Sequence, residues 1–227
     1  MRTWFQLPAL LVLVILVACA SGTSRSTDAN ALVDASRWTV ESFKTGKTDA
    51  DQAFRANLKT AQGVVIFPTT TKLAFVIGAE GGSGVLVARN ADGTWGYPAF
   101  YTMGGPSFGL QGGAVSSELI LVLRSRGAVD AVLNNQGKFG GDIQMIAGDF
   151  GRGAEAATTT NLGADVVGFS HGQGLFAGVS LEGAAIVKRN DLNTAYYGTG
   201  ATPTAIVRDG KFTNPQATPL REVLIVE

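Results

Sequence analysis

Apolar residues recur at helical spacing in two segments that follow the N-terminal region. One face of residues 28–46 carries Leu32, Ala35, Trp38 or Thr39, and Phe43, and a second repeat with the same period occupies residues 48–63. Each segment ends at a glycine, which is typical of the residue after a helix. The pattern predicts two helices that form an antiparallel pair, joined by a short loop.

From residue 64 onward the apolar residues come in short β-branched or aromatic runs separated by turn residues, which is the pattern of strands. The predicted strands are 64–68, 73–79, 85–89, 94–97, 107–115, 118–124, 142–147, 164–170, 175–181 and 184–188. Residues 125–134 and 191–197 return to helical spacing, and 220–226 fits a helix or a strand. Since short connections leave little room for parallel crossovers, we predict an α+β fold. Its helix pair packs on a largely antiparallel, curled sheet, with a barrel-like form as the extreme case.

The N-terminus has the pattern of an export signal. Arg2 supplies positive charge, and residues 7–17 are almost wholly apolar. This run is shorter than the roughly 20 residues that a membrane-spanning helix needs, so it is typical of a signal peptide. Leu16-Val17-Ala18-Cys19 then resembles the bacterial lipobox, in which the cysteine is lipidated and becomes the new N-terminus. A plain signal peptide with a chance cysteine, or a buried thiol, is the alternative.

Three regions follow from this interpretation. Residues 1–18 are the signal peptide, residues 19–30 are the lipidated N-terminus with a flexible tether, and residues 31–227 form a single domain. Cys19 is the only cysteine, so no disulfide forms within the chain. Ala20 follows the cysteine, where an aspartate would indicate inner-membrane retention, so we expect a lipid-anchored protein of the outer membrane that faces the periplasm.

Composition narrows the classes of function. Hydrophobic residues make up 45% of the chain and charged residues 16%, which is typical of a packed core and not of a disordered segment. Basic and acidic residues are equal at 18 each. A nucleic-acid-binding protein normally has a basic surplus that neutralises phosphates, so nucleic acid is not expected as a partner.

The sequence patterns that suggest catalysis do not form a complete site. Residues 105–109 match the GxSxG pattern of hydrolases, with Ser107 as nucleophile and His171, the only histidine, as base. That pattern requires a strand-to-helix turn, and the glycine-rich residues after it do not resemble a helix start. One histidine and one cysteine cannot build a conventional zinc site, and Asp142, Asp149 and Asp165 match no known calcium loop. We therefore predict no enzyme, no metal and no cofactor.

The order of the glycine-rich segments resembles the SYLF domain, a lipid-binding family. The matching stretches are Gly63–Pro68, Gly78–Leu86, Trp95–Phe100, Gly105–Gly113, Gly174–Gly183 and Tyr196–Gly198. The resemblance covers roughly residues 30–227. It implies binding of membrane lipids, here anionic phospholipids, without catalysis. The family's actin role is not carried over, because an exported bacterial protein would not meet actin.

Within that resemblance, five residues are candidates for lipid contact: Trp38, Phe43, Lys138, Lys188 and Arg189. The helix with Trp38 and Phe43 lies near the tether and could rest on a bilayer surface, while the basic residues could meet anionic headgroups. Their ordinary alternatives are a helix packed on the domain's own sheet and cations facing solvent. The alternative function is an envelope lipoprotein that contacts other proteins and binds no lipid besides its own anchor.

Overall fold

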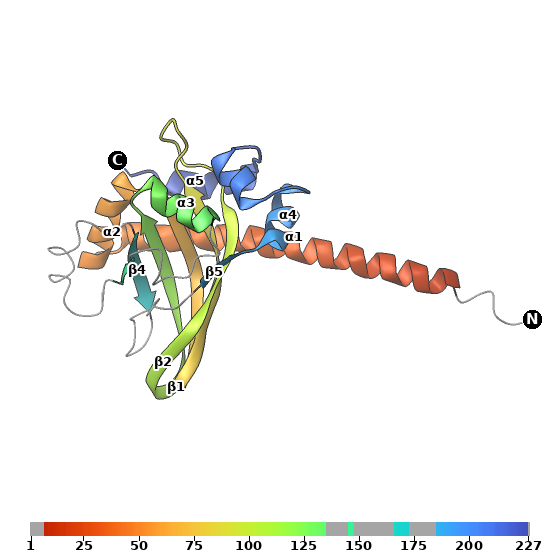
Figure 1. Ribbon diagram of the computed structural model, residues 1–227, viewed down its shortest axis with the longest axis horizontal. Coiled ribbons are helices and arrows are strands. Elements are labelled where there is room, and N and C mark those ends of the chain that lie inside the picture. The colour runs from red at the N-terminus through yellow and green to blue at the C-terminus, as the bar shows by residue number, and fades with distance from the viewer. Residues whose placement is uncertain (1–6, 135–144, 148–165, 173–184, 227) are drawn as a thin grey trace, which may run out of the picture.

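The computed structural model describes residues 7–134, 145–147, 166–172 and 185–226, with the backbone alone at 7–23, 72–77, 106–115 and 145–147 (Figure 1). The helices are α1 (Leu7–Thr45), α2 (Asp49–Thr60), α3 (Arg126–Asn134), α4 (Asn190–Tyr197) and α5 (Thr218–Val223), with short helical turns η1 (Thr204–Arg208) and η2 (Pro215–Ala217). The strands are β1 (Gly63–Ala88), β2 (Ala99–Leu123), β3 (Met145–Ala147), β4 (Val166–Gly172) and β5 (Ala185–Lys188). This is the predicted α+β fold.

Helix α1 is longer than predicted. It runs from Leu7 to Thr45 as one helix of 39 residues, and its N-terminal part extends away from the rest of the molecule (Figure 1). The expected flexible tether over residues 20–30 is therefore replaced by helix. This segment contains no proline and one glycine, so little in it stops a helix. Ala29 and Val33 are buried and fix the following turns against the domain.

Helix α2 begins where the sequence predicts. The Thr48 hydroxyl accepts from the Asp51 N–H at 3.2 Å, and the Asp51 carboxylate accepts from the Thr48 N–H at 2.8 Å. This reciprocal capping box satisfies two helix-start N–H groups. Arg55 on α2 donates to the carbonyl oxygens of Lys44 and Gly46 at 2.9 Å. The same helix therefore caps the end of α1, and the predicted helix pair is confirmed.

Five of the six predicted strands between residues 64 and 124 merge into two long ones. The sixth, 94–97, is wrong, because only Trp95 forms an isolated bridge there, with Arg89. Strands β1 and β2 pair antiparallel from Gly63↔Leu123 to Leu86↔Ala99, with two register shifts on the way. Gly82 and Gly84 lie between two predicted strands, where the sequence pattern indicated a turn. They are needed there because β1 bends back on itself. A β-carbon on Gly82 or Gly84 would lie 2.3 Å from the carbonyl oxygen of Thr69 or Ile66, respectively. Only glycine allows that approach.

The rest of the sheet is built on β2. Strands β4 and β5 pair antiparallel with its two ends, and β3 pairs with β4. The β3–β4 pair is parallel, although short connections predicted antiparallel pairing. Residues 148–165 connect the two strands, longer than the roughly dozen residues that a crossover needs. Among the described strands the sheet stays open, so the barrel-like form is not found. The predicted strand 175–181 lies outside the described residues, as do 142–144.

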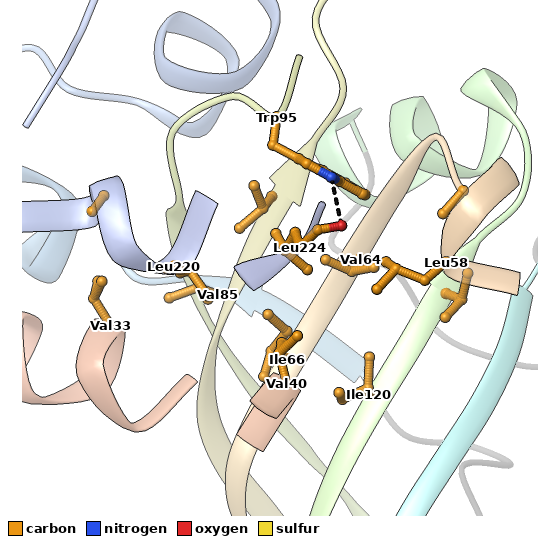
Figure 2. Packing of buried hydrophobic residues seen from close by; sticks show 14 of the residues in the cluster. Val33, Val40, Leu58, Val64, Ile66, Val85, Trp95, Ile120, Leu220 and Leu224 are labelled. Carbon is orange, nitrogen blue, oxygen red and sulfur yellow. Dashed lines mark hydrogen bonds between the residues drawn. The ribbon is translucent and has the colours of Figure 1, made fainter. Parts of the chain in front are cut away.

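The sheet is covered on both faces. One cluster joins the sheet to α3 and to Ala201 and Ile206. The other, larger in sequence span, joins it to α1, α2, α4 and α5. Figure 2 shows members of this cluster from α1, α2, the sheet and the C-terminal segment. In that cluster the Trp95 indole N–H donates to the Leu224 carbonyl oxygen at 3.0 Å, which ties the chain's C-terminal end to the sheet. The packing of α1 against the sheet therefore decides how Trp38 and Phe43 are oriented.

Candidate functional site

Trp38 lies on the outer face of α1, where 59% of it is exposed. The Arg37 guanidinium carbon lies 4.1 Å from the centroid of the Trp38 ring system. Asp34 and Glu41 stand four residues before and three after Trp38, so they neighbour it on the helix surface. The indole is therefore available to a partner, with both acidic and basic groups around it. This charge pattern does not by itself favour an anionic surface.

Phe43 occupies the opposite side of α1 and is fully buried. Its ring stacks on the His171 imidazole with centroids 3.6 Å apart, and the Phe54 ring lies 5.4 Å away. Phe43 is thus a core residue, and the predicted contact with lipid is not open to it in this conformation. The alternative for this part of α1, a helix packed on the domain's own sheet, is what the structure shows.

The predicted basic residues do not gather into one described patch. The Arg189 guanidinium forms two 2.9 Å bonds to the Asp191 carboxylate and a third, at 3.2 Å, to the Ser83 hydroxyl. The Arg189 hydrogen bond lowers the pKa of Asp191 to about 2, so both groups stay charged and paired. Lys188 is partly exposed at the end of β5. Lys138 lies outside the described residues, as does the side chain of Cys19.

Several polar side chains surround His171, which the sequence suggested only as the base of a hydrolase. We call Ser42, Phe43, Asp51, Glu118 and His171 the His171 centre. The imidazole Nε2 lies 2.8 Å from Asp51 Oδ1, and Nδ1 lies 3.5 Å from Glu118 Oε2 and 3.4 Å from the Ser42 hydroxyl. Four elements therefore meet at one side chain: α1, α2, β2 and β4.

Both ring nitrogens of His171 face carboxylate oxygens, which suits an imidazolium that donates on both sides. The hydrogen bond to Glu118 raises the pKa of His171 most; burial opposes this, and Asp51 raises it further. Burial would raise the pKa of Asp51, but hydrogen bonds from Thr48 and His171 outweigh it and lower that pKa. When the imidazole is protonated, the centre thus places one cation between two carboxylates.

Ser42, His171 and Asp51 have the residue types of a catalytic triad but not its arrangement. While the imidazole is protonated, it cannot accept the serine proton. Ser42 also lies inside α1, where backbone N–H groups bond within the helix and do not form an oxyanion hole. The GxSxG segment lies within β2, with Ser107 paired to Gly78, so it is strand and not a nucleophile elbow.

Neither a metal site nor a membrane span is found in the described part of the chain. No three His, Cys, Asp or Glu residues gather there in a way that could hold a metal ion. No helix there combines the length and hydropathy needed to cross a bilayer.

A cavity of about 520 Å³ lies beside Trp95 and α5, lined in part by Arg89 and Arg221. Both arginines donate to backbone carbonyl oxygens, Arg89 to Ala61 and Arg221 to Trp95, each at 2.8 Å. Arg221 also lies over the Tyr97 ring. These cations therefore stabilise the fold around the cavity. Their bonds give no indication of a ligand.

The sequence of this chain matches a known protein family. The profile of the family described as Ysc84, a Las17-binding protein actin regulator, matches residues 104–225. The chain is 37% identical to protein YSC84 of Saccharomyces cerevisiae over 170 residues, 74% of this chain and 36% of that protein. It is also 32% identical to human SH3 domain-containing YSC84-like protein 1 over 155 residues, 67% of this chain and 45% of that protein.

This chain belongs to the Ysc84 family, so the resemblance to SYLF proteins is confirmed. A third relative, LAS seventeen-binding protein 3 of S. cerevisiae, is 37% identical over 179 residues, 77% of this chain and 39% of that protein. The matched region spans less than half the length of each of these relatives. The family description names a Las17-binding actin regulator, and LAS seventeen-binding protein 3 is named as a binding protein.

Proposed function

We propose that this chain is a lipoprotein, anchored through Cys19, whose Ysc84-family domain binds phospholipids without catalysis. The observation that carries the proposal is the lipobox-like Leu16-Val17-Ala18-Cys19 placed directly before that domain. Two or more acyl chains on one cysteine anchor a protein far more firmly than one. Exposed Trp38 on α1 supplies an amphipathic ring of the kind that membrane interfaces accommodate.

A second candidate is an envelope lipoprotein that contacts other proteins and binds no lipid beyond its anchor. The acidic neighbours of Trp38, Asp34 and Glu41, favour it, because like charges would repel an anionic bilayer. The relatives' names refer to Las17 and actin regulation. We do not extend that role to this chain, because the predicted export signal would separate it from actin.

Flotation with liposomes tests the intrinsic lipid binding. Residues 20–227, which include every described core residue, are expected to float with vesicles that contain anionic phospholipid. Trp38→Ala should weaken binding about tenfold or more, because fully burying a large apolar side chain contributes roughly 1.5–3 kcal/mol. Ile225→Ala is the matched control, since Ile225 is 58% exposed on the C-terminal side of the fold. Failure to float with any vesicle composition would favour the second candidate.

Metabolic labelling tests the anchor separately. Cells that make the full chain in a bacterial host and take up a labelled fatty acid are expected to label the protein. Cys19→Ser should abolish the label and release the chain from the membrane fraction, because the serine oxygen cannot form the thioether. Label retained on the Cys19→Ser protein would contradict lipidation at this position.

A further inference from the structure

His171 on β4 contacts residues of α1, α2 and β2. Its ring stacks on Phe43 of α1, its Nε2 contacts Asp51 at the start of α2, and its Nδ1 faces Glu118 of β2. Glu118 also accepts from the Thr39 hydroxyl of α1 at 3.0 Å. The corner formed by the end of α1 and the start of α2 is therefore fastened to the sheet through His171 and through the Thr39–Glu118 hydrogen bond.

We propose that His171 is a pH-sensitive clasp, which holds the α1–α2 corner on the sheet when the imidazole is protonated and lets the corner open when it is not. A neutral ring carries one N–H, so it can donate to Asp51 or to Glu118 but not to both. The remaining carboxylate then faces a ring nitrogen that is an acceptor. Losing the proton thus turns one attractive contact into a repulsive one.

The groups that face the imidazole are few. From α2 it meets the Asp51 carboxylate and from β2 the Glu118 carboxylate, and these are the charges that act on it. From α1 it meets Ser42 and Phe43, both neutral, while Thr39 contacts it only through Glu118. Asp51 is 2% exposed in its side chain, so water can hardly replace a lost partner there. The clasp is therefore sensitive to a single proton.

The direction of the pH effect follows from the raised pKa of His171. The stabilisation is complete below the ordinary histidine pKa of about 6.5, and it is lost as the pH rises through the higher value in the folded protein. Asp51, whose pKa is lowered, acts oppositely: its contribution is present above about pH 3.9 and lost as the pH falls further. The clasp is thus tightest in mild acid.

Opening of the α1–α2 corner would expose a cluster of aromatic side chains. Phe43 and Phe54 pack on each other at 5.4 Å, and Phe54 packs edge-on against Phe169 of β4 at 5.5 Å. The corner of α1 and α2 covers these rings. Deprotonation of His171 therefore exposes buried aromatic side chains without unfolding the β1–β2 ribbon. This inference does not depend on lipid binding.

Two measurements on the full chain in a mild detergent test the clasp. Because the chain has one histidine, a single imidazole C2–H resonance reports its titration, and we expect a midpoint above pH 6.5. Hydrogen exchange is then compared at pH 6 and pH 9 after correction for intrinsic rates. We expect protection in α2 and the end of α1 to fall about tenfold for each pH unit by which that midpoint exceeds 6.5.

Glu118→Gln keeps an acceptor for Thr39 but removes one charge, so it should move the imidazole midpoint to lower pH. His171→Gln retains an amide donor for Asp51 and should make protection independent of pH. Equal protection of the unaltered protein at both pH values would overturn the proposal. So would the same pH effect in His171→Gln, or an unmoved midpoint in Glu118→Gln. If His171→Gln does not fold, the Glu118→Gln titration and exchange decide the question.

Discussion

Gly84→Val is expected to lower the free energy of unfolding by about 3 kcal/mol or more. A β-carbon at this position would lie 2.3 Å from the Ile66 carbonyl oxygen and 2.5 Å from Cδ1 of Phe67. The first of these is a backbone atom, so the two halves of β1 would have to separate. Urea denaturation followed by tryptophan fluorescence measures the loss. Domains of this size are stable by only about 5–15 kcal/mol, so a large fraction unfolded in water is the extreme result.

Gly104→Ala on β2 is the matched control. A β-carbon there meets nothing within 4 Å, and its φ is not positive. We expect a change within about 0.5 kcal/mol. If Gly84→Val were as stable as Gly104→Ala, the close approach of the two halves of β1 would be wrong.

Phe43→Ala is expected to lower the free energy of unfolding by about 3–5 kcal/mol, the usual loss for a buried phenylalanine. The substitution removes a fully buried ring and leaves a cavity between Phe54 and His171. Water entering that cavity would hydrate the imidazole and weaken its bonds to Asp51 and Glu118, so the pKa of His171 should move toward its ordinary value. Urea denaturation gives the stability, and NMR titration of the histidine gives the pKa.

Trp38→Ala separates burial from surface exposure on the same helix. Because most of the Trp38 side chain is exposed, we expect its loss to change stability by less than about 1 kcal/mol while reducing binding to vesicles. If Trp38→Ala destabilised the protein as much as Phe43→Ala does, the face of α1 that carries Phe43 would not be the one packed on the sheet.

The sequence predicts the helices of this fold better than its strands. Phe54 and Leu58 recur with the helical period, and Thr48 with Asp51 marks the start of α2, so local signals suffice there. Residues 78–84 misled the strand prediction, because glycines mark turns and also close backbone contacts. Only the three-dimensional path of β1 shows which applies. The parallel β3–β4 pair likewise depends on a crossover whose path leaves no local pattern.

The candidate site was less predictable than the fold. Periodicity left either Trp38 or Thr39 on the apolar face with Phe43. The structure buries Thr39 and Phe43 and leaves Trp38 exposed. The His171 centre combines residues from positions 42 to 171 that meet only in the folded chain. The local signals were the single histidine and the Asp51 capping position, which accounts for the hydrogen bonds of Asp51 with Thr48 but not for its bond with His171.

The register of the β1–β2 ribbon has a kinetic consequence. Its innermost pair, Leu86↔Ala99, lies beside the connecting turn, while its outermost pair, Gly63↔Leu123, joins residues far apart in the chain. Pairing can spread outward one step at a time, which avoids closing a large loop at once. Contacts between the two halves of β1 then form late. Strain placed at Gly84 should accordingly appear as faster unfolding, with the rate of refolding little changed.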